Sequence, residues 1–152
     1  MVVFGELGQL PLFNPDLEAD PPDPVVAFRQ AVGKANALII ASPEYAHGIS
    51  GVLKNALDWL VSYEGFVDKP IALVNASPRA RHAFDALHEV LRTMSANILS
   101  EASVTLPLLG TCVTEAAMLA SEEVSARIGR SLAALTSALT EAGRPGATFP
   151  VT

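Results

Sequence analysis

The sequence predicts a single α/β domain over residues 1–152, with an open parallel sheet and helices on both of its faces. Short, almost wholly apolar runs alternate along the chain with longer segments whose apolar residues recur every three or four positions. This alternation predicts right-handed crossovers between buried parallel strands. The composition agrees with a globular chain, because 50% of the 152 residues are hydrophobic and only 17% are charged.

Three apolar runs predict strands, at residues 2–4, 37–41 and 70–75, and a weaker strand signal lies within 97–105. A turn-rich stretch, residues 5–24, separates the first run from the rest. Its prolines prevent regular helix or ladder hydrogen bonds, so we expect a surface connection anchored by a few apolar side chains.

Four segments predict helices, at residues 25–34, 51–61, 81–95 and 116–142. In the first, Val25, Phe28 and Val32 share one face, and Asp23-Pro24 is a typical helix start. In the second, an apolar face is formed by Val52, Ala56, Trp59 and Leu60. Each helix can therefore cover the sheet with an apolar stripe.

Charge and composition exclude several classes of function. The formal net charge is −6, and the sequence has no basic cluster larger than Arg79 and Arg81, so we expect neither nucleic-acid nor membrane binding. Cys112 is the only cysteine, which rules out an internal disulfide and fits the cytoplasm. No secretory signal or membrane span is expected. The three histidines match no metal-binding pattern, so no metal is expected.

The best candidate site lies in two loops that follow predicted strands, because open α/β sheets bind ligands at the carboxyl ends of their strands. The first loop, residues 42–51, holds a proline, a tyrosine, a histidine and two glycines. We expect Gly48 and Gly51 to allow positive φ, and the following helix start to offer free N–H groups. These parts suit a planar, carbonyl-rich heterocycle, although they also fit an ordinary strand-to-helix loop.

Residues 42–60, SPEYAHGISGVLKNALDWL, closely resemble the signature of the NAD(P)H-dependent FMN reductase family, which has the flavodoxin-like fold. The resemblance implies FMN as cofactor and NAD(P)H as co-substrate, with hydride passing through the flavin to a flavin, quinone or similar acceptor. Because the flavin carries the redox chemistry, no side chain is expected to be catalytic. Relatives are commonly homodimers or homotetramers that pair through the helix after this loop.

By this resemblance, one edge of the flavin ring is bordered by the first loop and the other edge by residues that follow the next strand. The implied cofactor-binding residues are Pro43, Glu44, Tyr45, Ala46, His47, Gly48, Ser77, Pro78 and Arg79. His47 is equally acceptable as an ordinary surface residue. Many relatives carry a Gly-Gly pair in the second loop, where this chain has Arg79, Arg81 and His82. These side chains either crowd the ring, bind a phosphate, or are merely solvated.

The resemblance also predicts a short version of the fold. Family members begin with a further strand, a Gly-Ser-rich loop that holds the FMN phosphate, and a helix. Here the first run, residues 2–4, corresponds to the family's second strand. In the strand order 2-1-3-4-5 the absent strand is central, so we expect the remaining strands to pair together or another chain to fill the gap. In that case the FMN site is either rebuilt from other residues or shared between subunits, or the start of the chain is truncated relative to a longer natural protein. The alternative function is an interaction or oligomerisation module that no longer binds FMN.

Overall fold

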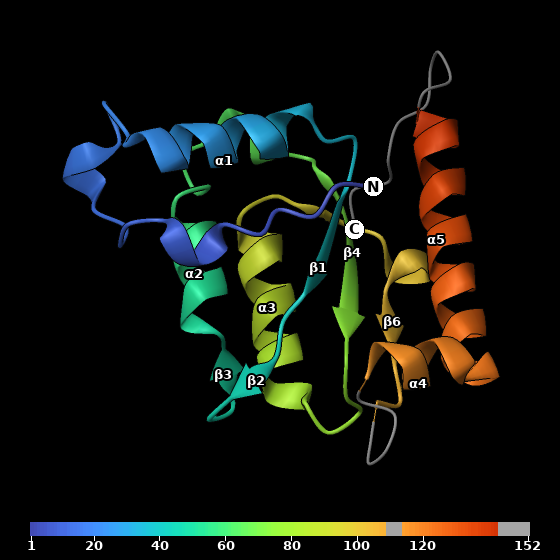
Figure 1. Ribbon diagram of the computed structural model, residues 1–152. Coiled ribbons are helices and arrows are strands. Elements are labelled where there is room, and N and C mark those ends of the chain that lie inside the picture. Colours follow the sequence, from blue (N-terminus) through green and yellow to red (C-terminus); the bar gives the residue numbers. More distant parts are fainter. Residues whose placement is uncertain (109–113, 143–152) are drawn as a thin grey trace.

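The computed structural model describes residues 1–108 and 114–142 and has a parallel sheet at its centre (Figure 1). The strands are β1 (Leu38–Ala41), β4 (Pro70–Asn75), β5 (Asn97–Ile98) and β6 (Val104–Thr105). Strand β4 is central: it pairs with β1 on one side and with β5 and β6 on the other, always in parallel. Ile39 lies opposite Ala72 in this register. The prediction of a parallel sheet is confirmed.

The weak strand signal of residues 97–105 is an interrupted strand. Two-residue strands β5 and β6 are separated by the short 3-10 helix η4 (Ser100–Ala102). Ser103 bridges the interruption, because its hydroxyl accepts a 3.0 Å hydrogen bond from the N–H of Leu73 in the central strand. A side chain thus replaces one rung of the ladder and keeps β4 paired along its length.

Helices cover both faces of the sheet, as predicted. They are α1 (Asp23–Lys34), α2 (Gly51–Asp58), α3 (Arg81–Thr93), α4 (Glu115–Ala120) and α5 (Glu122–Ala142). The larger core joins α1, α2 and α3 to Ile71 and Leu73 of β4, and it contains η3 (Glu64–Phe66). On the opposite face Leu135 of α5 packs with Ala72 and Ala102. Alternate residues of β4 therefore enter different cores, as the pleat requires.

The predicted strand at residues 2–4 is wrong. The segment carries no ladder hydrogen bonds; Val2 is 94% exposed and Val3 is 83% exposed. Only Phe4 is anchored, with its ring 5.2 Å from that of Phe28. An apolar run becomes a strand only beside a second strand that takes up its N–H and C=O groups, and within the described residues none lies there. The following connection contains η1 (Leu7–Gln9) and η2 (Pro15–Leu17).

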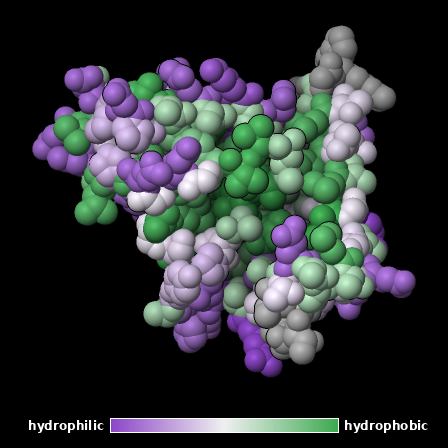
Figure 2. Space-filling model, in the orientation of Figure 1, coloured by the Kyte–Doolittle hydropathy of each residue, from purple (hydrophilic) through white to green (hydrophobic). Residues whose placement is uncertain are grey.

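Strand β1 forms an edge of the described sheet, since β4 is its one partner there. Ile39 is 40% exposed on this strand, and Leu132 of α5 is also 40% exposed. Figure 2 shows apolar side chains gathered between β1 and α5. This edge is the position at which the family's order would place a further strand. Cys112 and Gly143, which bear on the sequence predictions, lie outside the described residues.

Candidate functional site

The loops that follow β1 and β4 lie side by side at the carboxyl edge of the sheet, at the bottom of Figure 1. The first loop forms a small hairpin of β2 (Glu44–Tyr45) and β3 (Gly48–Ile49). The second loop leads into α3. The imidazole of His47, at the tip of the hairpin, stacks on that of His82 in the first turn of α3, with ring centroids 4.3 Å apart and planes at 27°. This contact joins the two loops that the resemblance assigns to the two edges of a flavin.

The tip of the hairpin adopts a left-handed backbone at two non-glycine residues. The φ angles are 48° for Ala46 and 59° for His47. A two-residue hairpin turn of the common kind requires positive φ at both central positions, and Asn-Gly normally supplies it. The expectation that Gly48 and Gly51 provide the positive φ is therefore wrong. Two L-residues adopt the strained turn instead, and strain of this kind gathers at functional sites.

Glu44 holds the base of the hairpin on α3. One of its carboxylate oxygens accepts a 2.9 Å hydrogen bond from the N–H of Ala83. The helix has Ala80 at its N-cap, with no side-chain cap of its own. A carboxylate at this end satisfies a free N–H group and interacts favourably with the helix dipole. In this chain Glu44 is thus already engaged as a cap supplied from another element.

The second loop is shaped by Asn75, a site residue that the sequence reasoning missed. Asn75 is 6% exposed; its side-chain oxygen accepts from the N–H of Ser77 at 3.2 Å, and its amide donates to the carbonyl of Ala80 at 3.2 Å. The hydroxyl of Ser77 accepts from the N–H of Arg79 at 3.2 Å. The loop 76–80 is therefore folded around one amide. The sequence does contain a signal for this role, because Asn75 stands at the end of a buried strand and asparagine side chains commonly hydrogen-bond the backbone of a following turn.

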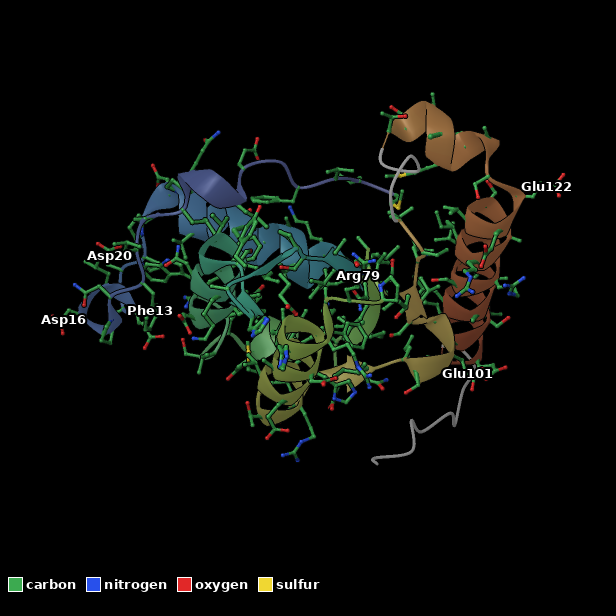
Figure 3. The ribbon with its side chains drawn as sticks, turned by 90° about the horizontal axis from the view of Figure 1, so that it is seen from below. Phe13, Asp16, Asp20, Arg79, Glu101 and Glu122 are labelled. Carbon is green, nitrogen blue, oxygen red and sulfur yellow. The ribbon has the colours of Figure 1, made fainter. Side chains whose placement is uncertain are left out.

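The site carries cationic groups without ion-pair partners. Arg79 and Arg81 are exposed, and neither forms an ion pair with any residue that the structure describes. Viewed from below, Arg79 lies in the middle of the molecule, well away from Asp16 and Glu122 at its two sides (Figure 3). Unpaired guanidinium groups at an open edge can bind the phosphate of a nucleotide through charge-assisted hydrogen bonds.

The space beneath the loops is too small for a planar ligand, so such a ligand would have to lie on their outer surface. Beneath them is a cavity of about 10 Å³, lined by Ile40, Asn75 and Phe84 among others, which holds no more than one water molecule. On the outside, Tyr45 is 66% exposed, and the N–H groups of Ala46 and His47 have no hydrogen-bond partner within the described chain. These donors and cations fit an anionic, carbonyl-bearing cofactor that lies across the edge of the sheet.

Asn55 and Trp59, within the matched signature, are directed away from this site. The oxygen of the Asn55 amide accepts from the N–H of Phe13 at 2.8 Å, and its nitrogen donates to the carbonyl of Pro11 at 3.0 Å. The indole of Trp59 donates to the same carbonyl at 2.8 Å. These two residues fasten the early surface connection to α2. Part of the sequence signature is therefore explained by folding rather than by cofactor contact.

The apolar face of α2 is largely used within the chain. Ala56, Trp59 and Leu60 are buried in the main core, which leaves Val52 and Val61 as the exposed apolar residues of residues 51–61. Lys54 and Asp58 form an ion pair on the outer face. The predicted pairing surface thus retains only a small apolar area.

The described residues provide neither a metal centre nor a membrane-spanning helix. Among them, no cluster of three or more His, Cys, Asp or Glu side chains is arranged to hold a metal ion. No helix in the described part of the chain combines the length and the apolar character needed to cross a bilayer.

Comparison with known proteins identifies a family of flavin reductases and several quinone reductases as similar to this chain. The family model described as NADPH-dependent FMN reductase matches residues 1–108. A quinone reductase of Pseudomonas putida is 37% identical over 93 residues, which is 59% of this chain and 50% of that protein. A 2-hydroxy-1,4-benzoquinone reductase of a Burkholderia species is 46% identical over 56 residues, 37% of this chain and 31% of its own. The chain thus spans half or less of the length of these curated relatives.

A solved structure shows the same fold. The flavoenzyme NAD(P)H:(acceptor) oxidoreductase FerB of Paracoccus denitrificans superposes with a TM-score of 0.73 at 24% identity, covering 86% of this chain and 75% of that one. The flavodoxin-like α/β class expected from the sequence is confirmed by this likeness and by the parallel sheet.

Proposed function

Because the chain belongs to the NADPH-dependent FMN reductase family, whose model matches residues 1–108, we propose that it binds FMN and oxidises NAD(P)H. The electrons pass to a small-molecule acceptor of the quinone type, which is the substrate class named for its P. putida and Burkholderia relatives. FMN, when bound, would supply the redox chemistry: NAD(P)H would give up a hydride, and the quinone would gain two electrons and two protons, one of them from solvent, to become the hydroquinone. The protein supplies binding and orientation.

The observation that carries this proposal is the meeting of the two loops at the carboxyl edge of the sheet, through the stack of His47 on His82. The hairpin offers the free N–H groups of Ala46 and His47 to the carbonyl edge of a flavin, and Tyr45 offers a flat, exposed face. Arg79 is in a position to bind a phosphate or another anionic group of the cofactor or co-substrate. The full set of proposed contacts comprises Pro43, Glu44, Tyr45, Ala46, His47, Gly48, Ser77, Pro78 and Arg79.

The test is the visible absorbance of the purified protein before and after FMN addition and desalting. Retained flavin that bleaches on addition of NAD(P)H and recovers on addition of a quinone supports the reductase. Arg79→Ala should weaken FMN or NAD(P)H binding by about ten- to a hundredfold, since a hydrogen bond to a charged group contributes about 1.5–3 kcal/mol. Arg130→Ala, which removes an exposed arginine of α5, is the matched control and should leave binding unchanged.

A second function is favoured by one observation: within the part of the chain that the structure describes, the outer edge of β1 beside exposed Ile39 has no partner strand. An unpaired strand edge is a template for another chain, so the protein also suits an oligomerisation module, and we propose a homo-oligomer in either case. A colourless protein that retains no FMN, yet has an oligomeric mass in size-exclusion chromatography, would favour the module. We place the protein in the cytoplasm, where its single cysteine, Cys112, would remain reduced.

A further inference from the structure

We propose that His82 is a positioning residue for the cofactor loop. Its ring holds His47 by stacking, and it thereby keeps the turn Ala46–His47 in the conformation that presents its N–H groups to a flavin. The inference deepens the proposed function and rests on it. These histidines are 35 positions apart and belong to different elements, so no local pattern connects them.

The turn at the tip of the hairpin is strained. Ala46 and His47 both have left-handed φ angles, a conformation that costs an L-residue free energy and that it leaves unless neighbouring contacts hold it. The hairpin behind the turn is short, with only the pairs Glu44–Ile49 and Tyr45–Gly48. Its ladder alone is a weak constraint, because isolated two-stranded hairpins are at best marginally stable.

Both strands of the hairpin pack against α3, and Ile49 is anchored on the main core. Two specific side-chain contacts add to this packing, and they act at different places. The Glu44 carboxylate accepts from the N–H of Ala83 and fixes the base of the hairpin. At the tip, the imidazole of His47 stacks on that of His82, with centroids 4.3 Å apart. The stack is the contact that acts on the strained residue itself. A nearly parallel ring pair also restricts the side-chain rotamer of His47, and through it the backbone of the turn.

Both imidazoles are exposed, so the stack can be removed without opening the core. Variants of His82 can therefore distinguish a role in positioning the turn from a role in the stability of the whole fold. His82→Ala should lower the melting temperature only slightly and raise the dissociation constant for FMN about two- to tenfold, the range expected from loss of an aromatic pair. His82→Phe keeps a flat ring at the same place and should retain the affinity of the native chain. His88→Ala, an exposed histidine farther along α3, is the matched control and should change nothing.

Amide hydrogen exchange without FMN gives a readout that does not depend on activity. His82→Ala should accelerate exchange at Tyr45 and Gly48, the ladder pair that closes the turn, while His82→Phe and His88→Ala exchange like the native chain. If the native protein binds no FMN, the proposed function fails, and the exchange data still decide whether His82 holds the turn. Unchanged exchange in His82→Ala overturns the inference. So does a His82→Phe variant that behaves like His82→Ala, because ring stacking is then not the cause.

Discussion

Replacing Asn55 by alanine tests whether the signature residues of α2 serve the fold. The Asn55 amide makes two hydrogen bonds to the surface connection, one from the N–H of Phe13 at 2.8 Å and one to the carbonyl of Pro11 at 3.0 Å. Each contributes about 1 kcal/mol, so Asn55→Ala should lower the free energy of unfolding by about 2 kcal/mol. For a chain of this length, that is a fall in melting temperature of about 4–8 °C.

Replacing Trp59 gives a second prediction that is linked to the first, because its indole N–H donates to the same Pro11 carbonyl at 2.8 Å. Trp59→Phe keeps most of the buried ring, loses this hydrogen bond, and should cost about 1 kcal/mol from that loss. The double variant Asn55→Ala/Trp59→Phe should deviate from the sum of the single effects, since residues that share a partner are coupled.

The assay is urea unfolding followed by circular dichroism, which serves all variants although Trp59→Phe removes the only tryptophan, with melting temperature as a second measure. Lys54→Ala is the matched control. It removes a neighbouring exposed side chain and its surface ion pair with Asp58, and it should cost no more than about 0.5 kcal/mol. If Asn55→Ala costs no more than Lys54→Ala, the reasoning is refuted and the asparagine is not a structural clamp.

Three further predictions concern other elements. Glu44→Ala should lower stability by about 1 kcal/mol in urea unfolding because it uncaps α3, and Glu44→Gln, which keeps an acceptor, should lose less; equal losses would contradict a capping role. Ser131→Ala should cost about 1 kcal/mol by removing the hydroxyl that donates to a carbonyl of η4, whereas Ser137→Ala on the exposed side of α5 should cost almost nothing. The Arg92 guanidinium hydrogen-bonds Glu89 and holds the pKa of that carboxyl below 4.5. Arg92→Ala should let this pKa rise in a carboxyl NMR titration, and the stabilisation by the pair should be present above pH 4.5 and disappear as the pH falls through the lowered pKa.

Several features of the fold follow from local pattern. The apolar runs 37–41 and 70–75 became β1 and β4 because each is too apolar to lie in water and too short to be a core helix. The helical spacing of Val25, Phe28 and Val32 placed all three in the main core. The apolar run 2–4 was misjudged because strand formation needs a neighbour, and no local pattern says whether one is present.

The candidate site was only partly predictable. Its location at the carboxyl ends follows from the alternation of strands and helices, and its loops were identified from their resemblance to a family signature. Contacts between the loops could not be predicted, because they join residues distant in sequence: Glu44 with the N–H of Ala83, and His47 with His82. The role of Asn75 was missed for a related reason, since an amide reveals its hydrogen bonds only once the loop is folded around it.

The sequence by itself therefore determined the class of fold, the order of the main elements and the family, because these depend on periodicity and on a contiguous motif. The tertiary structure alone decided which residues of that motif face the site and which serve packing. Neighbouring residues of one helix or turn point in different directions, so Tyr45 became exposed at the edge of the sheet while Trp59 became buried against Pro11. The tertiary structure also showed that the residues with positive φ in the strained turn are Ala46 and His47 rather than a glycine. Contacts with α3 restrain that turn, and they exist only after the chain has closed on itself.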